Sequence, residues 1–152
     1  MKISIPNKCD LGRINEIAKQ VHELHVNWRP DIFVSVDEVI EKEKFEELIE
    51  NKQIYVISEN DIIIGYATIL IKERQTHGMH DRKILELEAI CVDQNYRGKG
   101  AGTELINYLI DLGKKENCTE IRLTVNEENI NAIKLYERIG MRVKNIAYSM
   151  KL

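Results

Sequence analysis

The sequence predicts one α+β domain built around a mixed sheet. Segments with strand or helix patterns follow one another in the order β-α-α-β-β-β-α-β-α-β, which differs from the regular strand–helix alternation of a parallel sheet. The chain has 152 residues and no repeat, low-complexity run or linker, so a single domain over residues 1–152 is expected. A hydrophobic content of 43% is sufficient for one buried core.

Composition argues against several classes of protein. A net charge of -3 argues against a nucleic-acid partner, because phosphate contacts need a basic surface. The most apolar stretch, residues 62–71, is about half as long as a bilayer-spanning helix, and residues 1–6 lack the apolar core of a signal peptide. Cys9, Cys91 and Cys118 are widely spaced and form no CxxC pair, which predicts neither disulfides nor a metal site. We therefore expect a cytoplasmic protein without a membrane partner.

The N-terminal part predicts a short strand and two helices. After a strand at residues 2–5, apolar side chains at helical spacing predict a first helix, with Pro30 in the loop beyond it. The inner face of that helix would consist of Ile14, Ile17, Ala18, Val21 and Leu24. A second helix should begin at Ser35, because Glu38 three residues later completes a capping box.

A hairpin and a third strand are predicted in the middle of the chain. Its strands, residues 54–58 and 62–72, would be joined by a turn at residues 59–61. A polar loop at residues 75–82 leads to a strongly apolar strand at residues 84–92.

The remaining chain predicts a helix at residues 101–115, a strand at residues 120–125, a helix at residues 129–139 and a final strand at residues 142–151. Gly140 lies where a helix C-terminal cap needs positive φ.

Three alternating glycines, Gly98, Gly100 and Gly102, lie between the apolar strand and the next helix. Without Cβ atoms the backbone can bend tightly and approach a ligand. Successive N–H groups at the positive end of the helix would then form a site for a diphosphate. An ordinary strand-to-helix turn has the same pattern, so the glycines alone leave both interpretations open. Their spacing fits neither the GxGxxG fingerprint nor the GxxxxGKS/T loop.

Two motifs resemble the signatures of one family. Residues 92–105, VDQNYRGKGAGTEL, look like the acyl-CoA-binding signature of the GNAT N-acetyltransferase superfamily, an Arg/Gln-x-x-Gly-x-Gly/Ala turn. Residues 129–141, NINAIKLYERIGM, resemble its second signature, Asn-x-x-Ala-x-x-Leu-Tyr-x-x-x-Gly-Phe, with Met141 in place of the usual Phe. The two motifs occur in the family's order.

The resemblance implies a GNAT-like fold and activity. The sheet would be mixed and mostly antiparallel, with about six to seven strands, four flanking helices and a splay between the fourth and fifth strands. The chain would be an acyl-CoA-dependent N-acyltransferase that moves acetyl from acetyl-CoA, its co-substrate, directly to a primary amine. The amine would belong to a small molecule, a peptide N-terminus or a lysine. A homodimer is a common arrangement in this family.

The resemblance also implies which residues bind CoA. Backbone groups of Ile90 and Val92 would pair with the pantetheine arm at the splay. N–H groups of the turn would hold the pyrophosphate, and the residues of the turn are Arg97, Gly98, Lys99, Gly100, Ala101, Gly102 and Thr103. In the second motif, Asn129 and Ala132 would lie at the cofactor, although Asn129 equally suits a plain helix N-cap.

Tyr136 is the expected general acid and also a CoA contact. Acyl transfer to an amine releases a CoA thiolate, which a phenol within hydrogen-bonding reach can stabilise or protonate. In isolation, a tyrosine on an apolar helix face is more often a core residue. Its place in the Leu-Tyr element of the motif favours the catalytic role.

An amine acceptor is protonated at neutral pH and must lose a proton before it attacks. Glu88 is the first candidate for the base and Glu86 the second, because both lie on one face of the strand beside the expected thioester. The competing interpretation is that both are surface residues of a half-exposed strand. Family members that acetylate the N-terminus of a ribosomal protein often have a Glu where this chain has Thr124. The Thr either disfavours a ribosomal-protein substrate or means that Glu86 or Glu88 is the base.

The acceptor side is expected near the end of the first helix, where His25, Trp28 and Arg29 are the candidate substrate residues. His22 shares a helix face with His25, but no third ligand accompanies them, so no metal is expected. The alternative function is a non-catalytic acyl-CoA-binding sensor, which the presence of Tyr136 disfavours. A third possible function is a nucleotide-phosphate-binding domain that uses the glycine turn.

Overall fold

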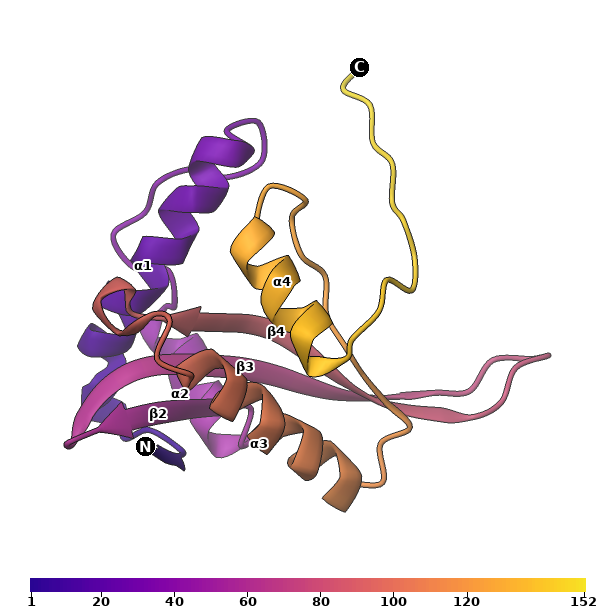
Figure 1. Ribbon diagram of the computed structural model, residues 1–152, viewed down its shortest axis with the longest axis horizontal. Coiled ribbons are helices and arrows are strands. Elements are labelled where there is room, and N and C mark those ends of the chain that lie inside the picture. The colour runs from indigo at the N-terminus through magenta and orange to yellow at the C-terminus, as the bar shows by residue number, and fades with distance from the viewer.

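The computed structural model describes residues 1–152 and contains a five-stranded sheet with helices on both faces (Figure 1). Its strands, which lie in chain order across the sheet, are β1 (Lys2–Ser4), β2 (Ile54–Glu59), β3 (Ile62–Arg74), β4 (Arg82–Val92) and β5 (Glu120–Arg122). Neighbouring strands are antiparallel except β4 and β5, which are parallel. The mixed, mostly antiparallel α+β architecture is therefore confirmed, whereas the prediction of six to seven strands is wrong.

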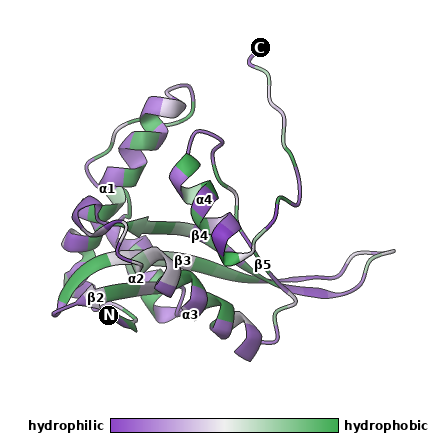
Figure 2. Ribbon diagram, viewed as in Figure 1, coloured by the Kyte–Doolittle hydropathy of each residue, from purple (hydrophilic) through white to green (hydrophobic).

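Four helices cover the sheet, namely α1 (Leu11–Trp28), α2 (Lys42–Glu50), α3 (Ala101–Lys115) and α4 (Ile130–Ile139). Alternate side chains of the apolar central strands point to opposite faces, so the core has two halves (Figure 2). One half packs α1 and α2 against Val56 and Tyr66, and the other packs α3 against Ile57 and Leu85. No helix combines the length and the apolar character that a bilayer crossing requires.

The second helix begins at Lys42 and not at Ser35, so the capping-box prediction is wrong. The Asn15 side chain provides the reason. Its Oδ1 accepts from the N–H groups of Val39 and Ile40, and its Nδ2 donates to the Ile40 carbonyl, so this backbone is satisfied without helical bonds. The Ser35 hydroxyl, the expected cap, instead donates to a carboxylate of α1. A contact from a distant helix has overridden a local signal.

The hairpin of β2 and β3 forms as predicted, and the third predicted strand, β4, pairs antiparallel with β3 in a second hairpin. Asn60 and Asp61 have positive φ, 50° and 62°, as a two-residue turn between β2 and β3 requires. β3 and β4 stay paired out to Arg74 and Arg82, and the loop between them closes a ribbon that projects from the sheet (Figure 1).

The C-terminal strands differ from the prediction. β5 ends at Arg122 and does not reach Val125, and residues 142–152 belong to no strand. The expected final strand is absent because no backbone hydrogen bond joins those residues to the sheet. Figure 1 shows them extending away from the sheet beyond α4.

Replacing Asn15 by Ala should lower the free energy of unfolding by about 2 kcal/mol, because part-buried backbone groups lose their only partner. Urea denaturation measures the change. Asn27→Ala, at an exposed position on the same helix, is the matched control and should cost less than about 0.5 kcal/mol. Equal losses in the two variants would contradict the role assigned to Asn15.

Candidate active site

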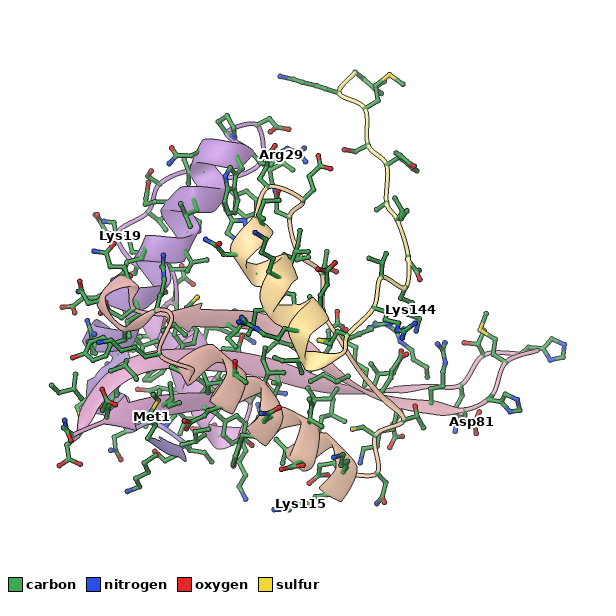
Figure 3. The ribbon with its side chains drawn as sticks, viewed as in Figure 1. Met1, Lys19, Arg29, Asp81, Lys115 and Lys144 are labelled. Atoms are coloured by element: carbon green, nitrogen blue, oxygen red, sulfur yellow. The ribbon has the colours of Figure 1, made fainter.

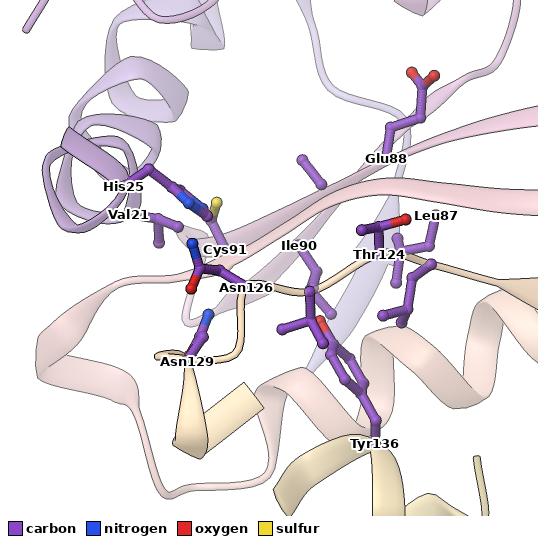
Figure 4. Close-up of a pocket in the computed structure, with 13 residues that line it drawn as sticks. Val21, His25, Leu87, Glu88, Ile90, Cys91, Thr124, Asn126, Asn129 and Tyr136 are labelled. Atoms are coloured by element: carbon purple, nitrogen blue, oxygen red, sulfur yellow. The ribbon is translucent and has the colours of Figure 1, made fainter. Parts of the chain in front are cut away.

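The sheet opens between β4 and the chain that follows β5. Their pairing ends at Glu86 with Arg122, whereas β4 continues to Val92. Backbone groups on this edge of β4 beyond Glu86 therefore lack a strand partner, as the expected splay requires. A pocket of about 110 Å³ occupies the opening (Figure 4). Its walls are Val21, His25, Leu87, Glu88, Ala89, Ile90, Cys91, Leu123, Thr124, Val125, Asn126, Asn129 and Tyr136.

The glycine turn presents free N–H groups at the mouth of α3. Gly98 and Gly100 adopt positive φ, 75° and 92°, which side-chain-bearing residues rarely do. No N–H group from Arg97 to Thr103 donates to a backbone acceptor within the chain. Together with the positive end of the helix, these donors form a site for an anionic ligand. Gly102 has a different role, because a Cβ there would lie 3.2 Å from a side chain of α4.

The first helix holds the turn in place. Asp93, at the start of the segment that leads from β4 into the turn, is buried and accepts from Arg13 and from the N–H of Asn95. The N–H of Gln94 donates to Gln20 of α1 at 2.8 Å. Burial opposes the charge of Asp93, but its donors outweigh this effect and hold its pKa below the ordinary value. The charged carboxylate therefore keeps the turn attached to α1.

Two side chains of the turn fold back on their neighbours. Arg97 Nε donates to the Val92 carbonyl at 2.9 Å, so that carbonyl is already occupied. Lys99 Nζ lies 5.0 Å from the centre of the Tyr96 ring, within range of a cation–π contact. Of the two residues expected to pair with pantetheine, Ile90 lines the pocket and Val92 does not.

The last helix brings its tyrosine to the pocket. Asn129 accepts from the N–H of Ala132 at 3.2 Å, and Gly140 ends the helix with a φ of 99°, so both predicted caps are confirmed. Tyr136 points from α4 into the pocket, toward β4 (Figure 4). Burial, and then the neighbouring Cys91, raise the pKa of Tyr136 to about 12. A phenol with this pKa is protonated at neutral pH and can donate its proton.

The two candidate bases have different surroundings. Glu88 lines the pocket, with its carboxylate turned away from Tyr136 (Figure 4). Glu86 lies outside the pocket and contacts Lys72 at 2.7 Å and Arg122 at 3.1 Å. Hydrogen bonds from these two cations lower the pKa of Glu86. A carboxylate engaged in two ion pairs away from the pocket is poorly placed to deprotonate an acceptor, so the geometry favours Glu88.

Only one of the three candidate substrate residues reaches the pocket. His25 lines it, and burial, followed by the charge of His22, lowers the pKa of His25, so its ring is neutral at neutral pH. Trp28 packs edge-on against His25, with ring centroids 5.4 Å apart. Arg29 bonds to Asp31 at 3.0 and 2.9 Å, at the tip of α1 (Figure 3). No group of three or more His, Cys, Asp or Glu side chains is arranged to hold a metal ion.

Several site residues were not predicted from the sequence. Val21 was assigned to the helix core but lines the pocket, and Asn126 comes from the irregular chain beyond β5. The pair of Arg13 with Asp93 joins positions 80 residues apart, which no local spacing can reveal. The one available signal for Asp93 was a carboxylate placed directly between an apolar strand and the glycine turn.

Fold and site together define a class of protein: an α+β domain that can hold an extended anionic ligand along an open strand edge, beside a protonated tyrosine. A family model described as the acetyltransferase (GNAT) family matches residues 18–141. The match covers most of the chain, which therefore belongs to the GNAT family of acyl-CoA-dependent acetyltransferases.

Curated relatives match parts of the chain. An uncharacterized N-acetyltransferase of Methanocaldococcus jannaschii is 40% identical over 65 residues, 43% of this chain and 29% of its own length. Glucosamine 6-phosphate N-acetyltransferase of Trypanosoma brucei brucei is 31% identical over 80 residues, 53% of this chain and 51% of its own. Spermine/spermidine N(1)-acetyltransferase of Bacillus subtilis is 39% identical over 57 residues, 37% of this chain and 38% of its own. The chain thus spans at most about half the length of these relatives.

A solved structure is similar over the whole chain. A mutant of the BH1408 protein from Bacillus halodurans superposes with a TM-score of 0.95 at 27% identity, over 100% of this chain and 99% of that one.

Replacing Arg13 by Met should leave the buried Asp93 carboxylate without its cation and lower the free energy of unfolding at pH 7 by about 2 kcal/mol. Because the pKa of Asp93 is depressed in the folded protein, its contribution is present above the unfolded-state pKa. That contribution is lost as the pH falls through the folded-state pKa. In urea denaturation, the difference between the variant and the natural chain should therefore shrink below about pH 4.

The control for this variant is Glu16→Gln, which removes only the exposed partner of Arg13 and should have little effect. A destabilisation of the Arg13→Met variant that does not change with pH would contradict the assignment to Asp93.

Proposed function

We propose that this chain transfers an acetyl group from acetyl-CoA directly to a primary amine, without a covalent enzyme intermediate. The observation that carries the proposal is that β4 connects three features. Its unpaired edge lines the pocket, Tyr136 reaches the same pocket, and the end of the strand leads into the glycine turn with its free N–H groups.

Acetyl-CoA suits these features chemically. Its pyrophosphate needs several converging donors, which the residues of the turn, 97–103, supply at the positive end of α3. Its pantetheine arm carries amides that need backbone partners, and the edge of β4 around Ile90 offers them. Asn129 lines the same pocket and accepts from the N–H of Ala132, so both residues stand at the start of α4. The bound co-substrate supplies the activated acetyl group, and the residues of this chain position that group.

Tyr136 is the proposed proton donor. The departing thiolate needs a proton or a hydrogen bond, and the raised pKa of Tyr136 keeps its hydroxyl protonated at neutral pH. Hydrophobic side chains form much of the pocket wall, and a hydrogen bond to a developing negative charge is stronger beside such side chains than in bulk water.

The acceptor is proposed to be a small-molecule primary amine that enters beside Glu88 and His25. Glu88 would take the amine's proton through water, since its carboxylate points away from Tyr136. His25 stays neutral, so it does not repel an ammonium group. A cationic amine such as a polyamine or an amino sugar is consistent with the relatives named for spermine/spermidine and glucosamine 6-phosphate. Thiol release from acetyl-CoA in the presence of such amines tests the acceptor class.

Replacing Gly98 by Ala should weaken CoA binding about tenfold, because a side chain disfavours the positive φ that aims the N–H groups. Isothermal titration with CoA measures the change. Gly78→Ala is the matched control, since Gly78 also has positive φ, 80°, and equally open surroundings, but lies in the β3–β4 loop. If both variants bind CoA as the natural chain does, the turn is not the pyrophosphate site.

Replacing Tyr136 by Phe should lower kcat for acetyl transfer about 100-fold while leaving the dissociation constant of CoA nearly unchanged. Thiol release gives kcat, and titration gives binding. Tyr108→Phe, on the outer part of α3, is the control and should keep full turnover. Full turnover of the Tyr136→Phe variant would remove the assigned proton donor. If the natural chain binds CoA but releases no thiol from acetyl-CoA with any amine, the non-catalytic sensor is favoured.

A further inference from the structure

Three charged side chains beside the pocket take no part in the proposed transfer. Glu86 and Arg122 are register partners on β4 and β5, and Lys72 lies diagonally opposite Glu86 on β3. Both cations contact the same carboxylate oxygen, Glu86 Oε2, at 2.7 Å from Lys72 Nζ and 3.1 Å from Arg122 Nη2. One carboxylate cannot neutralise two cations, so this cluster keeps a net positive charge.

Most donors of the two cations are free. A guanidinium has five N–H donors and an ammonium has three, but Arg122 and Lys72 each form an ion pair only with Glu86. Their side chains are 33% and 30% exposed, as expected where apolar stems pack on the sheet and charged ends reach water. The ion pairs thus hold two cationic ends close together while leaving donors for an anion.

A second pair of cations continues the same face of the sheet. Arg74 and Arg82 are direct cross-strand partners, and alternation along β3 places Arg74 on the face of Lys72. Neither arginine contacts a carboxylate, and the side chain of Arg82 bonds only to Met79 Sδ, at 3.8 Å. Like charges directly opposite each other destabilise a sheet. Hairpin stability therefore does not explain the pair, and neither does the composition of a chain with a net charge of -3.

The cluster adjoins the acceptor side of the pocket. Glu86 and Arg122 come two residues before Glu88 and Thr124, which line the pocket. Two residues of strand span about 7 Å. Leu87 packs in the half of the core that contains α3, so Glu86 and Glu88 both point to the opposite face, away from Tyr136 (Figure 4). One small molecule can therefore contact Glu88 and the cluster together.

We propose, resting on the acetyl transfer proposed above, that the acceptor amine also carries a phosphate or a carboxylate, which Lys72 and Arg122 bind. Glu86 is then a positioning residue that holds the two cations side by side. Arg74 and Arg82 add positive potential along the same face, which attracts an anion. A polyamine would be repelled here, so the cluster favours an amine with an anionic group over a polyamine.

A series of amines that differ only at the far end of a six-carbon chain tests the proposal. Aminohexyl phosphate, aminohexanoate, aminohexanol and hexamethylenediamine are compared by thiol release from acetyl-CoA. One or both anionic amines should have a kcat/KM about tenfold above that of the alcohol, mainly through KM, and the diamine should have the lowest value. The better anionic amine identifies the group. An alcohol that reacts as well as both anionic amines would overturn the anion site but leave acetyl transfer intact.

Replacing Lys72 by Gln should reduce the preference for the phosphate over the alcohol about tenfold. Lys83→Gln is the matched control. Lys83 also pairs with a glutamate and its side chain is also 30% exposed, but it precedes Ile84, the partner of Lys72, and so lies on the opposite face. An equal loss of preference in both variants, or full preference in the Lys72→Gln variant, would contradict the assignment.

Binding can also be measured without turnover. Titration of the free chain with aminohexyl phosphate should shift the backbone amides of Lys72 and Arg122 saturably, and the affinity should be lower in the Lys72→Gln variant. If no amine is acetylated but this binding is observed, the proposed transfer fails and the anion site stands. If these amides show no saturable shift, the anion site is wrong whether or not amines are acetylated.

Discussion

An unpaired strand edge inside the domain is the feature on which the rest of the site depends. β4 and β5 pair only as far as Glu86 and Arg122, so residues 87–92 of β4 have no strand partner on that side. Backbone groups away from water need hydrogen-bond partners, and an extended ligand with its own amides can provide them. The same opening makes room for Tyr136 and Glu88. All five strands are otherwise joined by hydrogen bonds to their neighbours, and this continuous pairing makes the walls of the opening rigid.

One helix connects the two halves of the site. α1 holds the segment that leads into the glycine turn through Arg13 and Gln20, and near its end it places His25 in the pocket. The approach to the glycine turn and the proposed acceptor side therefore both contact the same helix.

The parts of the fold and site that the sequence predicts correctly depend on local backbone rules. Alternating glycines, an Asn cap and Gly140 each specify a conformation through neighbours in sequence, and the structure has all three. The predicted start of α2 was wrong because Asn15, on α1, forms hydrogen bonds with the backbone that precedes α2. Spacing on β4 could not separate Glu86 from Glu88, because the ion pair with Lys72 comes from a neighbouring strand. The final strand was expected from a genuine alternation of apolar residues, but its own sheet provides it with no hydrogen-bond partner.

The central claim is that acetyl-CoA binds across the turn and the open edge of β4. Titration of the isotope-labelled chain with CoA, followed by backbone amide chemical shifts, tests it most directly. The account predicts saturable shifts that are largest at residues 97–103 and 87–92, with the β3–β4 loop around Gly78 unchanged. Shifts that do not saturate, or that cluster away from both segments, would contradict it.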